Sequence, residues 1–274
     1  MKIRPGALTF PAQLDRVRDR LVAQTEALRA VAQIYADTLQ AGGLVHVYAN
    51  GHSRVAVEEM CVRMGALTGF HPLLQAGLTT FTDVVGVNGI RVNQAMEQVE
   101  GLGEKLLAEF DVAAGEPLLV VSATGQTRAA VDVARAWLRR YPENPLIVLC
   151  SREQSDAAPP KHSCGKNLTH LAREAARGHI LDNGMPMGDT SVAVEGKTGS
   201  YSICPLSSLG AIGIVHCLNE LTLRELDRRG RRHPVLRNMH LQDTGDSYEA
   251  WLRDQRARYA RALDHPAAVP PPRA

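Results

Sequence analysis

The sequence predicts an α/β protein built on a doubly wound parallel sheet, and three features lead to this expectation. Short apolar runs alternate along the 274 residues with segments of helical periodicity, a pattern typical of strand–helix–strand units with parallel strands. Polar turns that contain glycine follow two of the apolar runs. The composition is 45% hydrophobic and 22% charged, which excludes a chain that is disordered throughout.

The N-terminal part is expected to contain a helix, a strand, a loop and a second helix, in that order. Apolar residues recur at helical spacing from Ala12 to Leu39, until the Gly42-Gly43 pair stops the helix. The apolar run 44–48, just before an Asn-Gly turn, indicates a buried strand. Helical periodicity returns from Arg54 to Leu67, and residues 70–74 are a candidate for another strand.

The same unit recurs in the second half of the chain. Residues 117–121 form an apolar run, 122–127 a polar turn, and 128–141 an amphipathic helix. Further short strands are expected at 145–150 and 179–181.

Two more helices complete the expected fold, one from Pro205 to Arg228 and one from about Ser247 to Leu263. The sequence contains no linker that would divide the core. The expected organisation is therefore a helical segment 1–43 packed on a core domain 44–230, followed by residues 231–274 with the last helix and a disordered Pro-rich tail.

Charge, hydropathy and cysteine content exclude several classes of protein. A formal charge of +2, from 31 Lys and Arg against 29 Asp and Glu, gives no electrostatic case for binding nucleic acid. No apolar run reaches the roughly 18–20 residues needed to cross a bilayer, and the N-terminus lacks the apolar stretch of a signal peptide, so a cytoplasmic protein without a membrane partner is expected. Five scattered cysteines without a C-x-x-C pair argue against a disulfide framework or a zinc ribbon.

The turn SATGQT at 122–127 is the stronger candidate for a binding site, because ligands of open α/β sheets bind beyond the carboxyl ends of the strands. Ser122, Thr124 and Thr127 offer three hydroxyls, and Gly125 allows close approach of the backbone. The helix that follows begins with free N–H groups and the positive end of its dipole, which favours an anion such as a phosphate. The alternative is that these side chains only cap the helix.

The earlier turn ANGHSR is less specific. Asn50, His52 and Ser53 could bond to sugar hydroxyls, but an Asn-Gly turn with Ser53 as a helix cap explains the same residues. One glycine falls short of G-x-G-x-x-G, and G-x-x-x-x-G-K-[ST] does not occur, so dinucleotide and P-loop sites have little support. No cofactor is expected.

Four motifs, in the right order, resemble the sugar isomerase (SIS) domain family over about Leu14 to Arg228. The strand–SATGQT–helix unit resembles the S-x-[ST]-G-x-T signature of that family, and the unit before it resembles the family's first loop. Three segments are similar to those of single-domain members: Gly51-His52-Ser53 with Glu58-Glu59-Met60, His162-Ser163-Cys164-Gly165-Lys166, and Asp182-Asn183-Gly184 with Pro186, Gly188 and Asp189. The resemblance implies a five-stranded flavodoxin-like sheet between helices, and a homodimer or homotetramer with the site near a subunit contact.

For the site, the resemblance implies a cradle for a sugar phosphate at the second loop, with the first loop and the end of the third strand facing the sugar. The expected binding residues are Asn50, Gly51, Ser53, Ser122, Ala123, Thr124, Gly125, Thr127 and Ser151. Members of the family move protons between adjacent sugar carbons, generally with Glu and His and without a metal. We therefore expect an isomerase of a sugar phosphate or other anionic sugar. The alternatives are a phosphosugar-binding sensor without chemistry, and an etherase or lyase acting on an amino-sugar phosphate.

Glu59 is the expected proton-transfer residue, with His52 as its assistant. Glu59 lies nearly two turns into the helix that begins at the first loop, and helix side chains lean back toward the N-terminus. Glu58 is about 100° away around the helix, so the two carboxylates are not expected to face one site. The alternative for Glu59 is a surface carboxylate or an ion-pair partner. His216 and Glu220, four residues apart, could also reach the pocket.

The remaining polar motif residues have open roles. His162 and Lys166 lie in the loop after the third strand, where a lysine could neutralise an anion or simply be solvated. Asp182 and Asp189 offer oxygens for a cation, but their spacing is not that of an EF-hand loop, and no metal is expected.

Overall fold

The computed structural model describes residues 8–61, 63–80, 82–238, 240 and 247–263, and it confirms the α/β class. Five parallel strands form one sheet in the order β2-β1-β3-β4-β5, which is the flavodoxin-like order. The strands are β1 (Val45–Ala49), β2 (Phe70–Leu73), β3 (Leu118–Val121), β4 (Leu146–Cys150) and β5 (Gly178–Asp182). Because the chain leaves β1 toward β2 and returns to β3 on the other side of β1, the carboxyl ends of β1 and β3 flank the crevice where such sheets bind ligands.

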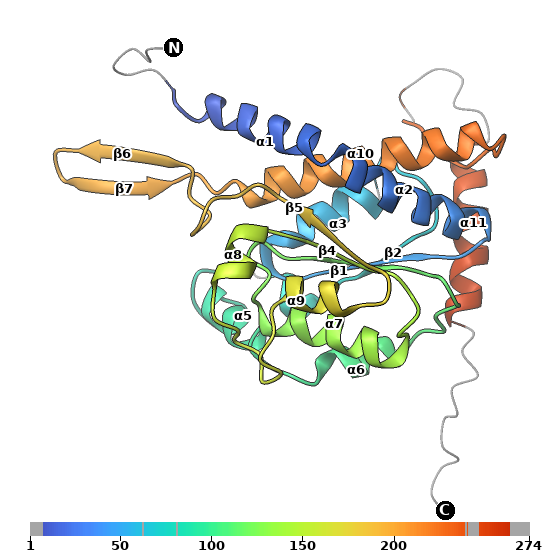
Figure 1. Ribbon diagram of the computed structural model, residues 1–274, viewed down its shortest axis with the longest axis horizontal. Helices are drawn as coiled ribbons and strands as arrows, with labels where there is room; N and C mark the ends of the chain where they lie inside the picture. Colours follow the sequence, from blue (N-terminus) through green and yellow to red (C-terminus); the bar gives the residue numbers. More distant parts are fainter. Residues whose placement is uncertain (1–7, 62, 81, 239, 241–246, 264–274) are drawn as a thin grey trace, which may run out of the picture.

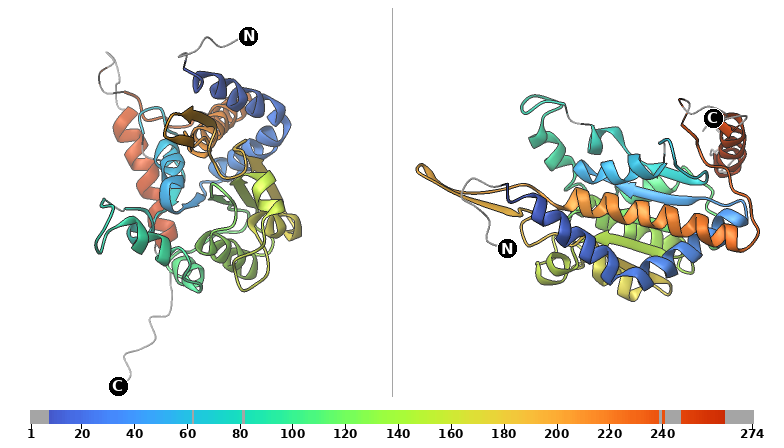
Figure 2. Two further views of the ribbon diagram at one scale, coloured as in Figure 1. Left: turned by 90° about the vertical axis from the view of Figure 1, so that its left-hand side faces the viewer. Right: turned by 90° about the horizontal axis from the view of Figure 1, so that it is seen from above.

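Helices cover both faces of the sheet (Figures 1 and 2), because successive apolar side chains of each inner strand point to opposite faces and both faces have to be buried. On one face lie α2 (Thr25–Gln40), α3 (Arg54–Cys61) and α10 (Ser207–Arg228), with α1 (Pro11–Ala23) along α10. On the other face lie α6 (Leu102–Leu107), α7 (Arg128–Arg140) and α9 (Leu168–Glu174). Leu119 and Val121 of β3 pack toward the first layer, and Leu118 and Val120 pack toward the second.

The remaining elements are short or peripheral: η1 (Gly51–Ser53), α4 (Ala76–Thr79), α5 (Ile90–Met96), α8 (Arg152–Ala157), β6 (Val192–Gly196), β7 (Gly199–Ile203) and α11 (Ser247–Leu263). The helix expected up to Leu67 ends at Cys61, because the chain turns at Gly65 with a φ of +92°. The expected tail after Leu263 lies outside the described residues. Within the described part of the chain, no helix combines the length and the apolar character needed to span a membrane.

The helix expected from Ala12 to Leu39 is two helices, broken at Gln24 without a proline or glycine. The Gln24 backbone leaves helical geometry, with φ −111° and ψ 22°. Its side-chain amide bonds twice to the backbone of β5: Nε2 donates to the carbonyl of Asp182 at 2.9 Å, and Oε1 accepts from the Asp182 N–H at 3.0 Å. A tertiary contact with the sheet edge therefore accompanies the break in the helical periodicity.

The opposite edge of the sheet is covered by α11 in the same way. Gln255 Oε1 accepts from the Gly69 N–H at 2.8 Å, and its Nε2 donates to the Phe70 carbonyl at 3.0 Å. The Tyr259 hydroxyl donates to the same carbonyl at 2.9 Å. Arg258, which is buried, donates to the Gly43 carbonyl just after α2 at 2.7 Å. Both outer strands thus have backbone groups paired with glutamine side chains.

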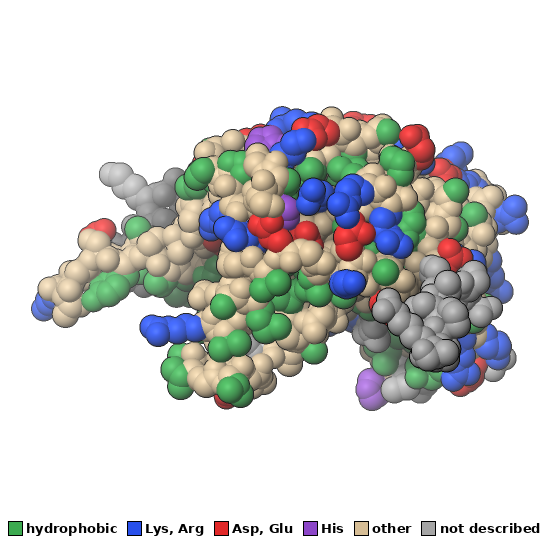
Figure 3. Space-filling view, turned by 90° about the horizontal axis from the view of Figure 1, so that it is seen from below, with side chains coloured by type: hydrophobic (Ala, Val, Ile, Leu, Met, Phe, Trp, Pro, Cys, Tyr) green, Lys and Arg blue, Asp and Glu red, His purple; other side chains and the backbone are tan. Residues whose placement is uncertain are grey.

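The hairpin of β6 and β7 was not predicted from the sequence, and it projects from the body of the molecule (Figure 1). In its register Val192 faces Ile203 and Val194 faces Tyr201, so these four side chains share one face. Val194, Tyr201 and Ile203 are each more than 40% exposed. Figure 3 shows apolar side chains along the hairpin and on the neighbouring lobe that carries α5. Within one chain this apolar face stays in contact with solvent.

A polar cluster is buried near the amino ends of β1 and β2, at the end of the sheet opposite the crevice. His46 Nδ1 and His71 Nδ1 are 3.0 Å apart, and His46 Nε2 is 3.3 Å from Glu116 Oε2. Burial, with His46 next to it, lowers the pKa of His71 to about 3. We call His46, His71 and Glu116 the imidazole cluster.

Candidate active site

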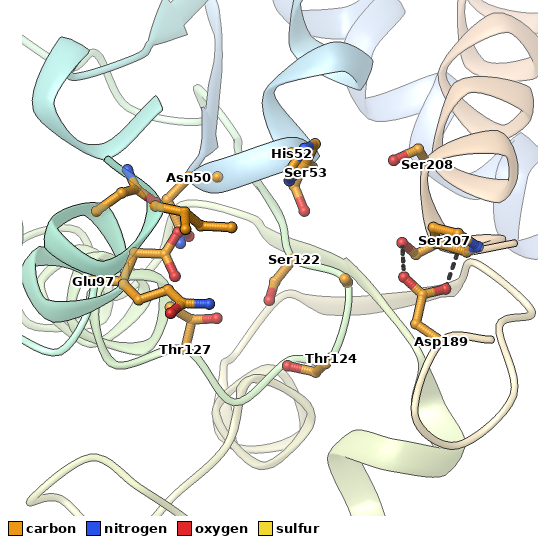
Figure 4. Close-up of a pocket in the computed structure, with 16 residues that line it drawn as sticks. Asn50, His52, Ser53, Glu97, Ser122, Thr124, Thr127, Asp189, Ser207 and Ser208 are labelled. Atoms are coloured by element: carbon orange, nitrogen blue, oxygen red, sulfur yellow. Dashed lines mark hydrogen bonds between the residues drawn. The ribbon is translucent and has the colours of Figure 1, made fainter. Parts of the chain in front are cut away.

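A cavity of about 390 Å³ opens at the carboxyl ends of β1 and β3 (Figure 4). Four segments form its walls: the loop after β1, the loop after β3, α5 with the residue that follows it, and the residues around the start of α10. This is the crevice that the strand order predicts.

The loop after β1 brings four expected residues to the cavity, namely Asn50, Gly51, His52 and Ser53. Gly51 has a φ of +55°, and a Cβ at this position would lie 2.7 Å from Glu97 Oε1. Glycine is therefore required twice over, for the left-handed backbone and for the carboxyl packed against it. His52 is exposed and lines the cavity.

The loop after β3 contributes Ser122, Ala123, Thr124 and Thr127, as expected from the motif. Ser122 Oγ accepts from the Gly125 N–H at 3.1 Å, and Thr124 Oγ1 accepts from the Gln126 N–H at 3.3 Å. Each hydroxyl still has its own O–H to donate to a ligand. Thr127 precedes α7 and makes no side-chain cap bond.

Gly125 and Ser151 do not line the cavity, contrary to the sequence-based expectation, and both shape it from behind. Gly125 has a φ of +72°, and a Cβ there would lie 2.6 Å from Ser155 Oγ. Ser151 is fully buried; its Oγ accepts from the Gln154 N–H at 3.2 Å, and its N–H donates to the Ala123 carbonyl at 2.9 Å. These two residues fix the loop after β3, and other residues of that loop line the cavity.

The motif around Asp182-Asn183-Gly184 also supports this loop. Asn183 is buried, and its Nδ2 donates to the Ala123 carbonyl at 3.0 Å. Asp182 Oδ1 accepts from the Gly184 N–H at 3.0 Å, and Asp182 Oδ2 lies 3.5 Å from Arg20 Nη1. The motif therefore holds the backbone that carries the expected anion cradle.

Glu97 is a cavity residue that sequence reasoning missed. It directly follows α5, its carboxyl lies against Gly51, and its side chain is hydrogen bonded to that of Asn50. Burial raises the pKa of Glu97, and the hydrogen bond with Asn50 offsets part of that rise. No motif spacing connects residue 97 with the two loops, because tertiary packing of α5 brings it there.

Asp189 lies across the cavity from Glu97 (Figure 4). Its Oδ1 accepts from the N–H groups of Leu206 and Ser207 at 2.9 and 2.8 Å, and its Oδ2 accepts from Ser207 Oγ at 2.5 Å. Asp189 adopts a φ of +57°, a left-handed conformation that is uncommon outside glycine. Its carboxylate therefore caps α10 and orients Ser207, which also lines the cavity.

Glu59, the expected proton-transfer residue, lies outside this cavity. Its carboxylate faces α10, where Oε1 accepts from Arg63 Nη1 at 2.9 Å and Oε2 lies 3.4 Å from His216 Nε2. Helix α3 carries Glu59 away from the loop at which the helix starts, so this carboxylate belongs to an ion-pair cluster on the outer surface. Glu58 pairs with Arg54 at 3.6 Å.

The loop after β4 places the remaining motif residues outside the cavity as well. His162 is buried between Glu100 and Asp132, and Lys166 pairs with Glu174. Among the residues that the structure describes, no three His, Cys, Asp or Glu side chains converge as a metal site would require. Within the same residues, no Lys or Arg lines the cavity, so an anion there would depend on hydroxyl and N–H donors.

Comparison with known proteins agrees with the fold and the motifs. The family model described as the SIS domain matches residues 9–140. This match covers the N-terminal half of the chain up to the end of α7, and together with the cavity it supports a phosphosugar-related function.

The chain is similar in sequence to several UPF0309 proteins. The chain is 28% identical over 241 residues to UPF0309 protein ABC0887 of Shouchella clausii, covering 86% of this chain and 92% of that protein. It is 25% identical over 254 residues to UPF0309 protein SCO4393 of Streptomyces coelicolor, covering 92% and 95%. Among solved structures, a phosphoheptose isomerase from Francisella tularensis is similar with a TM-score of 0.49 and 15% identity, covering 78% of this chain and 93% of that one.

Proposed function

We propose that the protein is an isomerase of a sugar phosphate or other anionic sugar, interconverting aldose and ketose by proton transfer. The observation that carries the proposal is the position of the Glu97 carboxyl. It lies in the same cavity as three hydroxyls at the end of β3, beside the start of α7. The cavity thus combines a candidate proton-transfer group with neutral donors suited to an anion.

Isomerisation needs a base that removes the proton beside the carbonyl and returns it to the neighbouring carbon through an enediol. Glu97 is suited to both steps, because its raised pKa makes the carboxylate a stronger base and keeps the acid form available to return the proton. The proposal therefore assigns to Glu97 the role that the sequence suggested for Glu59. His52, exposed at the cavity wall, is proposed to open the cyclic form of the sugar.

The anion is proposed to bind at Ser122, Ala123, Thr124 and Thr127. Two hydroxyls of this loop already accept from backbone N–H groups, so their own protons are free to point at the ligand. Asn50, Gly51 and Ser53 are proposed to contact the sugar from the opposite loop. No metal or cofactor is invoked for these steps.

The direct test is exchange of solvent deuterium into a panel of pentose, hexose and heptose phosphates, each paired with its free sugar, followed by NMR. An isomerase incorporates deuterium at the carbon next to the carbonyl and forms the isomeric sugar phosphate. Exchange with loss of a substituent would instead indicate an etherase or lyase. Binding by thermal shift without any exchange would indicate a sensor.

Two matched variants test the assignment of the base. Glu97→Gln should lower turnover by about 10²–10⁴-fold and leave the affinity for the phosphate ester within a few-fold. Glu59→Gln removes an equivalent carboxylate outside the cavity and should retain turnover. The assignment is overturned if Glu97→Gln remains fully active, or if Glu59→Gln is the variant that loses activity.

A further inference from the structure

We infer that His162 is a positioning residue, which holds the segment 97–103 in place and thereby keeps the Glu97 carboxyl in the cavity. The inference rests on the proposed function only for what Glu97 then does. The motif His162-Ser163-Cys164-Gly165-Lys166 contributes no side chain to the cavity, so its part in the site must be indirect.

The segment 97–103 joins α5 to α6 and is tied to α7 at both of its ends. The Glu97 carbonyl accepts from the Ala129 N–H at 3.0 Å, in the first turn of α7. The Gly103 N–H donates to Asp132 Oδ2 at 2.6 Å, one turn further along. A Cβ at Gly103 would lie 2.7 Å from the Asp132 carbonyl oxygen, so the backbones are in close contact here.

The middle of the segment is held by the loop after β4. Glu100 Oε1 accepts from the Ser163 N–H at 2.9 Å, and Glu100 Oε2 accepts from the Ser163 hydroxyl. These two bonds to Ser163 lower the pKa of Glu100, so it binds as a carboxylate. Arg128 Nε lies 3.7 Å from the same carboxylate.

His162 lies between the two carboxylates that hold the segment. Its side chain is fully buried, with Nε2 3.4 Å from Asp132 Oδ1 and 3.6 Å from Glu100 Oε2. The Cys164 N–H donates to Nδ1 at 3.0 Å, which leaves the ring proton on Nε2, directed at the carboxylates. Without that donor the carboxylates of Glu100 and Asp132 would repel each other. Glu100 is the one expected to shift, because it lies on the connecting segment whereas Asp132 lies on α7.

A movement of Glu100 is transmitted to the cavity because Glu97 lies only three residues before it in the same segment. The Glu97 carboxyl is packed against Gly51, where even a Cβ would come within 2.7 Å of it, and it bonds to Asn50. A displaced segment would withdraw the carboxyl from these contacts and expose it to water. Its pKa would then fall toward that of an ordinary glutamate.

The test measures Glu97 without needing a substrate. The full-length protein is labelled with ¹³C at the glutamate carboxyls, the Glu97 signal is assigned by its loss in Glu97→Gln, and its titration is followed by NMR. In His162→Leu the Glu97 midpoint should fall toward that of an exposed glutamate, and amide exchange in 97–103 should become roughly tenfold faster or more. His162→Gln, whose amide can still donate toward the carboxylates, should restore the titration of the unmodified protein.

His170→Leu is the matched control. His170 also accepts from a backbone N–H, that of Asn167 at 3.1 Å, but it caps α9 and does not touch the segment. This variant should leave the Glu97 titration unchanged. Should His162→Leu fail to fold, Ser163→Ala is the second test, because Ser163 is exposed and the change removes its hydroxyl bond to Glu100 while the backbone N–H bond remains.

An unchanged Glu97 titration and unchanged exchange in a folded His162→Leu or Ser163→Ala protein would overturn the inference. Failure of the proposed function has a different signature: no sugar phosphate in the panel would exchange, while the Glu97 titration still depended on His162. The two hypotheses are therefore tested separately.

Discussion

The imidazole cluster predicts that stability falls steeply with acidity in a range where most proteins change little. His71 has its pKa lowered from 6.5 to about 3 by burial and by His46. Between these values the unfolded chain binds a proton that the folded chain does not, so acid favours unfolding. At pH 5 the unfolded imidazole is almost fully protonated, which corresponds to a loss of about 2 kcal/mol in the free energy of unfolding relative to pH 8. The loss begins as the pH drops below about 6.5 and continues toward 3.

The perturbation is His71→Phe, which keeps an aromatic ring against Phe110 and Tyr259 but removes the titrating group. At pH 8 the variant should be less stable, by about 0.5–1.5 kcal/mol for the lost bond to His46. Between pH 8 and pH 5, however, its stability should fall by about 2 kcal/mol less than that of the unmodified protein. The pKa of Glu116 is lowered from 4.5, because burial, which raises it, is outweighed by the hydrogen bonds to the carboxylate, that with His46 first. Protonation of Glu116 therefore also reduces the stability of the folded chain in acid, but mainly below pH 5.

The assay is urea unfolding at pH 8 and pH 5, at one fixed protein concentration so that any association cancels. Leu168→Ala is the control for lost packing: it removes a fully buried side chain and should cost about 2–5 kcal/mol at both pH values alike. If His71→Phe and the unmodified protein lose the same stability between pH 8 and pH 5, the cluster is not the source of the pH dependence.

Three further outcomes are expected. Thr124→Ala and Thr127→Ala should each weaken binding of the phosphate ester by about 1.5–3 kcal/mol by calorimetry, whereas equal affinity in variant and parent would place the anion elsewhere. Gly210→Ala would put a Cβ 1.9 Å from the Asn183 carbonyl oxygen, so urea unfolding should show a loss of at least about 1–3 kcal/mol, and an unchanged midpoint would contradict the close packing of α10 on that loop. The exposed apolar face of the β6–β7 hairpin predicts a dimer or larger assembly in sedimentation at micromolar concentration; Tyr201→Lys should weaken it, and a monomer in the unmodified protein would contradict this prediction.

The centre of the sheet could be predicted from the sequence because its inner strands are buried on both faces and are therefore mostly continuous apolar runs. The residues 118–121 and 146–150 show this directly, since every one of them is buried. The break at Gln24 could not be predicted, because it depends on a bond to Asp182, 158 residues away. The β6–β7 hairpin had a local signal that was missed: apolar residues alternate at 192 and 194 and again at 201 and 203, around a Gly-Lys-Thr-Gly turn.

The candidate site divides in the same way. The loops after β1 and β3 were predictable, because a turn between a strand and a helix carries its polar residues to the carboxyl edge of the sheet. Glu97 was not, since its place beside Gly51 follows from how α5 packs. The proximity argument for Glu59 relied on its side chain leaning back over the roughly 9 Å of helix that separate it from the loop, but the direction of that side chain is set by its ion-pair partners. These partners are Arg63 and His216.

The two glutamines at the sheet edges affect how exposed the chain is to aggregation while it is being synthesised. Gln24, between the two N-terminal helices, hydrogen bonds to the backbone of β5, so these bonds can form as soon as β5 is synthesised. Gln255 closes the β2 edge from α11, which leaves the ribosome only after the whole sheet has been translated. During that interval β2 presents unpaired backbone groups, the arrangement that invites another chain to add a strand. Chains interrupted between 230 and 247 should therefore collect in aggregates even though every strand of the sheet is present.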